Sequence, residues 1–223
     1  MSESTEFDAR DRNHFTFHAT PLRKAAVRLA DMLFGVLMDL EVKGPQHFPE
    51  EGALILASNH VSNLDVFPMQ LATPRPIFFM GKAELFKFEP LGAVLRDFGA
   101  FPVYRGEQDS WALRHARKVL DAGQVLGMFP EGHRSKGRGL GPAKTGTARL
   151  AIESGCAVLP MAIIGSDRIL RDLPQRTQVR VEFLRPMQAR PDETPEELTD
   201  RMLHTIAAAL PEEMRGVYAS GTN

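Results

Sequence analysis

The chain has 223 residues, of which 43% are hydrophobic and 25% charged, and its 27 Lys and Arg residues nearly balance its 28 Asp and Glu residues. This composition excludes a disordered chain, a collagen and a bulk polycation, and we expect no nucleic-acid partner. Domains commonly contain roughly 100–200 residues, so the length predicts one domain with a single core and one main site.

The cysteine content and the N-terminal composition bear on the compartment. Cys156 is the single cysteine, which excludes an internal disulfide, and Met1–Asp11 carries acidic residues where a signal peptide has a basic region and an apolar stretch. These features are typical of a chain made for a reducing cytosol. The longest uncharged stretches, Gly52–Leu64 and Ser154–Ser166, fall well short of the roughly 20 residues that a spanning helix needs. We therefore expect no segment to cross a bilayer unaided.

The first predicted element is an amphipathic helix over Pro21–Leu40, with Thr20 as its N-cap. Its apolar residues recur at helical spacing, with basic Arg23, Lys24 and Arg28 beside them. The apolar stripe is Leu22, Ala26, Leu29, Leu33, Val36 or Leu37, and Leu40. Two interpretations remain open: a helix lying in a membrane interface, and an N-terminal core helix packed against the rest of the fold.

Strand and helix patterns then alternate. The strand-length apolar runs, typical of strands buried on both faces, are Ala53–Ser58, Pro76–Met80, Phe101–Tyr104, Val125–Phe129 and Val158–Ile164, followed by the alternating run Val179–Leu184. The predicted helices are Asp65–Leu71, Ser110–Ala122 with Ser110 as cap, Thr147–Ser154 closed by Gly155, and a last helix opened by the capping box Thr194–Glu197.

This alternation predicts an α/β fold, a single domain with a central, mostly parallel or mixed sheet flanked by helices and an N-terminal amphipathic helix. We divide the chain into a tail and amphipathic helix (1–40), the main domain (41–215) and a C-terminal tail (216–223). In such folds the functional site lies beyond the strand ends.

The first polar constellation is the segment Ser58–Asp65, directly after an apolar strand. Across a strand-to-helix turn, the Asp65 carboxylate can accept the Nδ1–H of His60, fix its tautomer and leave Nε2 free to take a proton. The alternative is a polar turn in which Ser62, Asn63 or Asp65 caps the next helix and His60 is merely exposed.

The second constellation is Phe129-Pro130-Glu131-Gly132-His133-Arg134-Ser135, again after an apolar strand. Glycine allows a tight turn, Glu131 can orient a neighbour, and Arg134 offers a planar fork of donors suited to a phosphate. The alternative is a surface turn with a local Glu–Arg pair. His60, Asp65, Glu131 and His133 match no standard metal-ligand spacing, so we expect no metal.

The basic, glycine-rich loop Ser135–Gly146 fails the P-loop pattern, because Ala143 and not glycine precedes Lys144. We interpret it as a mobile loop whose Lys136, Arg138 and Lys144 attract phosphate groups, including those of lipid headgroups. The alternative is a flexible surface loop without a ligand.

Taken together, Asn59-His60-x4-Asp65 and the later Phe129-Pro130-Glu131-Gly132-x-Arg134-Ser135 resemble the glycerolipid acyltransferase family, whose best-known members are the 1-acyl-sn-glycerol-3-phosphate acyltransferases. The likeness runs from about Val42 to Ile164 in the family's order. The further matching blocks are Gly81–Leu85, Gly99–Gly106, Lys144-x-Gly146 and Val158–Ala162.

The resemblance implies that His60 is the general base on the acceptor hydroxyl and that Asp65 orients it. The hydroxyl then attacks an acyl thioester directly, so no acyl-enzyme is needed, and Cys156 lies outside every motif. The residues expected at the acceptor's phosphate are Glu131, Gly132 and Arg134, assisted by Lys82 and Arg105. The auxiliary candidates are Asn59, His133, Ser135 and Lys144. His133 stands where the family commonly has Thr or Ser, which affects the acceptor preference.

These residues predict an O-acyltransferase that moves a fatty acyl group from acyl-CoA or acyl carrier protein to a lysophospholipid, with 1-acyl-sn-glycerol-3-phosphate as the first choice and no cofactor. The expected location is the cytoplasm, peripherally on the inner face of the membrane. One alternative is another acceptor, such as a lyso-aminolipid or a different lysophospholipid. The other is a non-catalytic lipid-binding protein on the same fold, against which the intact His60 and Asp65 argue.

Overall fold

The computed structural model describes residues 10, 13–17, 21–104, 109–135 and 137–221. Arg105, Lys136 and Thr20, which carry expectations from the sequence, lie outside these residues. The helices are α1 (Pro21–Leu37), α2 (Val66–Ala72), α3 (Glu89–Asp97), α4 (Ser110–Asp121), α5 (Gly146–Ser154) and α6 (Pro195–Ala209). The strands are β1 (Met38–Lys43), β2 (Leu54–Ser58), β3 (Ile77–Lys82), β4 (Ala100–Val103), β5 (Val125–Met128), β6 (Ala157–Ile164) and β7 (Thr177–Phe183).

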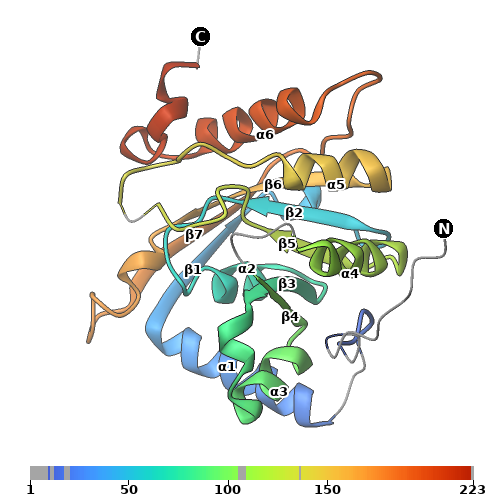
Figure 1. The fold of residues 1–223 in the computed structure, drawn as a ribbon. Helices are drawn as coiled ribbons and strands as arrows, with labels where there is room; N and C mark the ends of the chain where they lie inside the picture. The colour runs from blue at the N-terminus through green and yellow to red at the C-terminus, as the bar shows by residue number, and fades with distance from the viewer. Residues whose placement is uncertain (1–9, 11–12, 18–20, 105–108, 136, 222–223) are drawn as a thin grey trace, which may run out of the picture.

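The described strands form one sheet of seven strands in the order β1-β7-β6-β2-β5-β3-β4 (Figure 1). The five strands from β6 to β4 are parallel to one another, whereas β7 is antiparallel to β6, and β1 is parallel to β7. The predicted α/β fold with a mostly parallel, mixed sheet is therefore confirmed. The carboxyl ends of β2, β3, β4, β5 and β6 lie at one edge of the sheet, where sites are expected in this class of fold.

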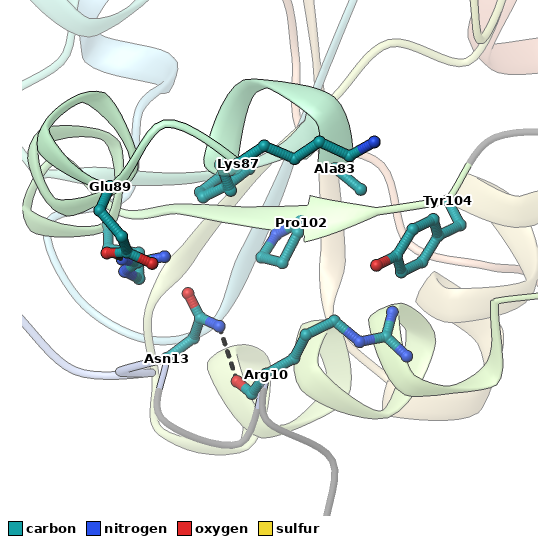
Figure 2. A pocket seen from close by; sticks show the side chains of 9 residues that line it. Arg10, Asn13, Ala83, Lys87, Glu89, Pro102 and Tyr104 are labelled. Carbon is teal, nitrogen blue, oxygen red and sulfur yellow. Dashed lines mark hydrogen bonds and ion pairs between the residues drawn. The ribbon is translucent and has the colours of Figure 1, made fainter.

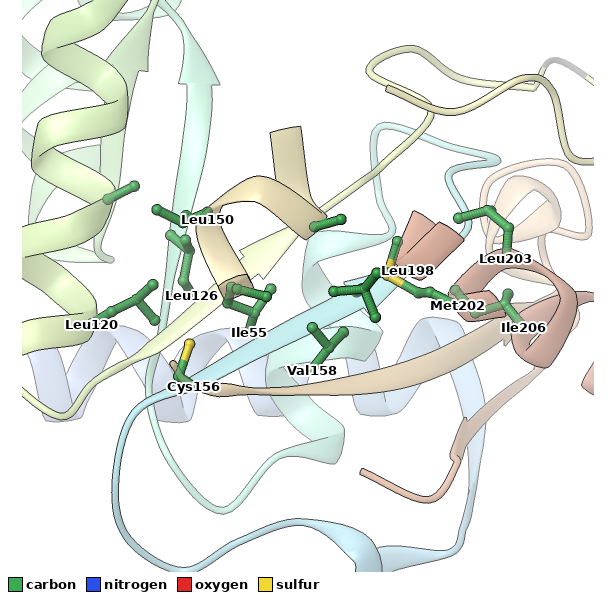
Figure 3. Packing of buried hydrophobic residues seen from close by; sticks show 14 of the residues in the cluster. Ile55, Leu120, Leu126, Leu150, Cys156, Val158, Leu198, Met202, Leu203 and Ile206 are labelled. Atoms are coloured by element: carbon green, nitrogen blue, oxygen red, sulfur yellow. The ribbon is translucent and has the colours of Figure 1, made fainter. Parts of the chain in front are cut away.

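Helices cover both faces of the sheet, which explains why the central strands read as continuous apolar runs. Every residue of β2 is buried. Successive side chains of a strand point to opposite faces. Ile55 accordingly packs with Leu126 and Val158 under α4, α5 and α6 (Figure 3). Leu54 and Leu56 belong to the opposite core, which contains Met69 of α2.

Two elements differ from the sequence-based expectation. The helix predicted to reach Leu40 ends at Leu37, because the chain turns at Met38 into β1, an edge strand paired with β7. Helix α3 was not predicted. The predicted Ser110 cap of α4 is wrong: Asp109 is the N-cap, and its carboxylate accepts the N–H of Ala112 at 3.1 Å. A carboxylate also interacts favourably with the positive end of the helix dipole.

Helix α1 has two apolar faces. Phe34 and Met38, just past the helix end, are buried with Ile169 and Val179, and the Phe34 ring stacks on Phe67 at 4.2 Å. The predicted stripe is divided: Leu37 and Leu40 pack against this buried cluster, whereas Leu29, Leu33 and Val36 are exposed. The exposed fractions are 65% for Leu29, 70% for Met32, 55% for Leu33 and 71% for Val36. The helix therefore packs on the fold through one face and leaves a second apolar face uncovered. In the described part of the chain, no helix is long and apolar enough to span a membrane.

The loop residues around Leu140 are hydrogen-bonded to the C-terminal segment, including Val217 of the tail in the sequence-based division. Leu140 is buried, its N–H donates to the Met214 carbonyl at 2.9 Å, and its carbonyl accepts the N–H of Val217 at 3.0 Å. A Cβ at Gly216, whose φ is +52°, would lie 2.1 Å from the Leu140 oxygen. Only glycine permits this close approach.

Candidate active site

The segment from Ser58 to Asp65 forms a tight turn at the carboxyl end of β2. The Nδ1 atom of His60 lies 2.7 Å from Oδ2 of Asp65, and the same oxygen accepts the N–H groups of Val61 at 2.8 Å and Ser62 at 2.9 Å. Asp65 precedes α2, but its side chain makes no capping hydrogen bond to that helix. The fully buried carboxylate therefore holds the turn and the imidazole.

Ser166 completes the surroundings of Asp65. It follows β6 in a short 3-10 helix (Ser166–Arg168), and its buried hydroxyl donates to Oδ1 of Asp65. Sequence reasoning missed this residue, because 101 positions separate it from Asp65 and no local spacing connects the two. The available signal was a polar residue directly after a buried strand that pairs with β2.

The imidazole of His60 is also held by ring stacking. It stacks on the ring of Phe129, with centroids 4.1 Å apart and an angle of 15° between the planes. Because Nδ1 faces a carboxylate, the proton of the neutral ring resides on Nδ1, and Nε2 carries the lone pair. Nε2 has no hydrogen-bond partner among the described residues.

Glu131 joins the two predicted turns. Its Oε1 accepts the N–H of His60 at 2.9 Å and its Oε2 accepts the N–H of Gly141 at 3.1 Å, while Ser135 donates its own N–H to the His60 carbonyl at 2.7 Å. Burial raises the pKa of Glu131, opposed by the N–H groups of Gly141 and His60. Both carboxylate oxygens thus have backbone partners, and a carboxylate has no proton to donate to a phosphate.

Asn59 ties β2 to β6. Its Nδ2 donates to the Ile163 carbonyl at 2.8 Å and its Oδ1 accepts the Ile163 N–H at 2.8 Å. The side-chain amide therefore continues the pairing of the two strands beyond Ser58, where β2 ends. This leaves the next residue, His60, at a fixed place above the sheet.

Basic residues also follow the strands at this edge of the sheet, at the end of β3 and in the turn after β5. The side chains of Lys82, His133, Arg134 and Lys144 make no hydrogen bond or ion pair with any described residue. Gly132 has a φ of +69°, and a Cβ there would lie 3.4 Å from Cε of Lys144, so the lysine extends over the turn. Lys82 is exposed at the end of β3.

A cleft of about 240 Å³ opens beside the two turns. Asn59, Glu131 and Ser135 line one part of it, and the carboxylates of Asp167 and Glu213 line another. The hydroxyl of Ser135 is buried and has no hydrogen-bond partner in the described part of the chain. A ligand with donor groups, including an amine, would find acceptors on this wall.

Cys156 lies outside this site. The thiol is buried in the core beneath α4 and α5, 2.9 Å from the Ser154 hydroxyl, and burial raises its pKa. A raised pKa disfavours the thiolate that nucleophilic catalysis requires. Within the described ranges, no group of three or more His, Cys, Asp or Glu residues is placed to hold a metal ion.

Comparison with known proteins adds independent observations. Residues 39–164 match the family model described as Acyltransferase. A 1-acyl-sn-glycerol-3-phosphate acyltransferase of Neisseria meningitidis serogroup B is 32% identical over 63% of this chain and 55% of its own length. The chloroplastic 1-acyl-sn-glycerol-3-phosphate acyltransferase BAT2 of Brassica napus is 28% identical over 58% of this chain and 38% of its own length.

A solved structure shares the fold. The crystal structure of the 1-acyl-sn-glycerophosphate acyltransferase PlsC from Thermotoga maritima superposes with a TM-score of 0.70 at 24% identity, covering 84% of this chain and 78% of that one. The chain spans less than two-thirds of the length of the two curated relatives above. The family model covers more than half of this chain and includes both turns. The chain therefore belongs to the Acyltransferase family.

Proposed function

We propose that this protein is an O-acyltransferase that moves a fatty acyl group from an acyl thioester to the hydroxyl of a lysophospholipid. The observation that carries the proposal is the buried 2.7 Å contact between His60 Nδ1 and Asp65, which leaves Nε2 without a partner among the described residues. A histidine held in this tautomer is suited to remove a proton from an alcohol.

The reaction needs few steps. Nε2 of His60 takes the hydroxyl proton as the oxygen attacks the thioester carbonyl, and Asp65 stabilises the resulting imidazolium. The tetrahedral intermediate then collapses with cleavage of the carbon–sulfur bond. His60 returns the proton to the departing thiol, so the enzyme ends in its starting state. No protein nucleophile and no cofactor is required.

We assign the phosphate of the acceptor to Arg134, the Gly132 turn and Lys82, with Arg105 as a further candidate. His133 and Lys144 assist them at the rim. Several donors without protein partners suit a dianion, which brings acceptors for all of them. Glu131 acts as a positioning residue, because its oxygens are occupied by the His60 and Gly141 N–H groups. The preferred acceptor in this proposal is 1-acyl-sn-glycerol-3-phosphate, the substrate in the names of the relatives.

One observation favours a second acceptor class, a lyso-aminolipid. The cleft beside Asn59 is lined by Asp167 and Glu213, and carboxylates attract an ammonium group. An acceptor panel separates the two classes: purified protein, one long-chain acyl-CoA, and lysophosphatidate, a lyso-aminolipid or another lysophospholipid. Thiol release and mass spectrometry of the lipids are the readouts, with His60→Ala as the control. Acyl transfer to lysophosphatidate supports the first assignment. Thioester turnover that no acceptor stimulates, in the wild-type protein, contradicts the proposal.

We further propose that the protein works on a membrane surface, at the cytoplasmic face, where its lipid substrate resides. The uncovered face of α1 carries Leu29, Met32, Leu33 and Val36, and exposed Lys24 and Arg28 lie on the same helix. This composition suits an interfacial helix. Helix α3 lies close to α1 at the lower end of the ribbon in Figure 1, and exposed apolar residues occur in and beside α3. They are Leu85, Phe88, Leu91 and Val94.

The membrane test uses substitutions instead of a deletion, because removing residues 1–40 would also remove Phe34, Met38 and part of β1 from the fold. Leu29→Ser with Leu33→Ser should leave thermal unfolding nearly unchanged and reduce sedimentation with anionic vesicles by at least tenfold, since each leucine loses a favourable transfer of about 1.5–3 kcal/mol. A double substitution of exposed polar residues that changes no charge, Gln46→Ser with Gln175→Ser, serves as control. Unchanged vesicle binding of the leucine variant contradicts the proposal.

A further inference from the structure

A cleft of about 400 Å³ lies beside the ends of β3 and β4, apart from the site around His60 (Figure 2). Apolar groups of Ala83, Phe86 and Pro102 form part of its wall, and charged side chains form the rest. None of these residues has a role in the proton transfer or phosphate binding proposed above. The cleft therefore requires its own explanation.

The strand register relates the cleft to His60. Leu56 of β2 and Phe79 of β3 both pair with Gly127 of β5, so Asn59 and Lys82, three residues further along, are at the same level. Val103 of β4 pairs with Lys82. Three steps between neighbouring strands, at about 4.8 Å each, place β4 about 14 Å from β2. A ligand that occupies the cleft and reacts at His60 must be long and extended.

The cleft contains a buried acceptor without a donor. Asn13 is 8% exposed, and its Nδ2 donates to the Arg10 carbonyl at 2.6 Å, which fixes the orientation of the amide. Its Oδ1 has no hydrogen-bond partner among the described residues and points away from the Arg10 carbonyl into the cleft (Figure 2). Buried amide oxygens in folded proteins normally accept a hydrogen bond. A ligand here is expected to bring an N–H or O–H group.

Positive charge predominates in the lining. Arg96 forms an ion pair with Glu89 at 2.7 Å, and the exposed Lys87 has no ion-pair partner in the described part of the chain. Arg10 is held by both oxygens of Asp109, at 3.0 and 2.8 Å, and its guanidinium lies 5.0 Å from the centroid of the Tyr104 ring. These cations favour an anionic group on the ligand.

We infer that this cleft binds the phosphopantetheine arm of the acyl donor, an inference that rests on the proposed acyl transfer. The arm is a long chain with its thioester at one end and a phosphate at the other, and it carries amide N–H groups and apolar carbons between them. Asn13 accepts an amide N–H, Phe86 and Pro102 contact the carbons, and Lys87 meets the phosphate. The arm is common to coenzyme A and acyl carrier protein. A glycerol phosphate is too short to extend from His60 to this cleft.

Calorimetric binding to the full-length protein tests the inference without any turnover. The probes are pantetheine, 4′-phosphopantetheine, coenzyme A, lysophosphatidate and inorganic phosphate. The variants are Lys87→Ala and Asn13→Leu. Lys118→Ala, on the exposed side of α4 and outside the cleft, is the matched control. Thermal unfolding of each variant checks that it is folded.

The two variants should produce different patterns. Asn13→Leu should weaken all three pantetheine compounds by about three- to tenfold, because it removes a neutral hydrogen bond, and leave inorganic phosphate unaffected. Lys87→Ala should weaken 4′-phosphopantetheine and coenzyme A by about three- to tenfold and leave unphosphorylated pantetheine unaffected. If Asn13→Leu does not fold, the contrast between pantetheine and 4′-phosphopantetheine in Lys87→Ala decides alone.

Other outcomes overturn the inference. Weaker lysophosphatidate binding in Lys87→Ala, with unchanged coenzyme A, assigns the cleft to the acceptor. If Lys87→Ala weakens the binding of coenzyme A but not that of 4′-phosphopantetheine, Lys87 contacts the nucleotide part of coenzyme A. If neither variant changes any affinity, the cleft is not the binding site of the arm. Failure of acyl transfer itself is recognised separately, as wild-type protein that binds coenzyme A but acylates no lipid. Where acyl transfer is observed, the KM values of Lys87→Ala for acyl-CoA and for acylated acyl carrier protein identify the donor that binds in the cleft, because only the KM of that donor should rise.

Discussion

The turn that holds His60 and the basic groups beside it lie at the same edge of the sheet but are built in opposite ways. In the turn, Asp65 and Glu131 are buried and accept hydrogen bonds from other parts of the chain. Arg134, Lys82 and Lys144 have charged ends without protein partners in the described structure.

This difference fits the roles that we propose for the two regions. Proton transfer depends on a fixed tautomer and a fixed direction of Nε2, so the histidine is held by hydrogen bonds and by ring stacking. A phosphate arrives with its own acceptors, and cations already paired within the protein would have to exchange partners to bind it. Unpartnered donors are therefore suited to a ligand, and fully partnered groups to a catalytic frame.

The largest expected effect comes from removing the base. His60→Ala should lower kcat by about 10²–10⁴-fold, the usual contribution of a positioned general base. Thermal unfolding should change little, because Asp65 retains its backbone and Ser166 donors. The measurement is thiol release from acyl-CoA with acceptor present. Full activity of a folded variant would exclude His60 as the base.

A smaller effect is expected on the other side of the comparison. Arg134→Ala removes a charge-assisted contact of about 1.5–3 kcal/mol, so the KM for a phosphate acceptor should rise by about ten- to a hundredfold while the KM for the thioester stays nearly constant. Arg134→Lys should restore only part of the loss, because a point charge does not reproduce the planar fork. A rise in the thioester KM instead would assign this arginine to the donor.

Ser166→Ala tests how much the positions of Asp65 and His60 depend on a residue that does not touch substrate in the proposed mechanism. It leaves Oδ1 of Asp65 without its serine donor, so the carboxylate and the imidazole are held less firmly. We expect kcat to fall by about three- to thirtyfold with unchanged KM values, and Ser166→Thr to recover part of it. The matched control is Ser154→Ala, a serine in α5 that bonds to Leu150. An acceptor KM that rises with unchanged kcat would place Ser166 in substrate binding.

The smallest effect concerns charge that acts on a surface instead of on one phosphate. Lys24→Gln or Arg28→Gln should each weaken binding to anionic vesicles by about fivefold, since a basic residue near such a surface contributes about 1 kcal/mol, and the difference should disappear as salt rises. The acceptor KM measured with a short-chain soluble lysophospholipid should not change. Binding that is insensitive to salt would mean that these charges lie away from the membrane.

The fold class could be predicted from the sequence because the central strands are buried and are therefore continuous apolar runs in the sequence. Each of β2, β5 and β6 is a run of apolar residues closed by a turn residue, and the parallel sheet follows from the helices between them. The edge strand β1 has no such continuous apolar run. After the buried Met38, its residues alternate between exposed and partly buried, and Leu40 continues the helical spacing of α1. Only pairing with β7 distinguishes strand from helix there.

The site was predictable where its residues are neighbours in sequence. His60 and Asp65 lie in one turn, and Glu131 to Arg134 in another. The contacts between the turns were not predictable, because a hydrogen bond from the His60 N–H to Glu131 depends on β2 and β5 being adjacent. The same holds for Ser166, which reaches Asp65 from the end of β6. Helix α3 was missed although Leu91 and Val94 have helical spacing, because Pro90 and Gly92 within its nine residues are typical of loops.

The effect of the stacked Phe129 ring on His60 depends on the charge of the imidazole, which changes during the proposed reaction. While the imidazole is neutral, the two rings are simply a pair of stacked apolar faces, 4.1 Å apart. In the reaction that we propose, the acceptor's proton moves to Nε2, and the same ring then carries a positive charge above the electron-rich face of phenylalanine. Such an arrangement stabilises a cation by about 0.5–2 kcal/mol. Phe129 thereby acts most strongly during the short interval in which the negative oxygen of the intermediate exists, although it has no group that can exchange a proton.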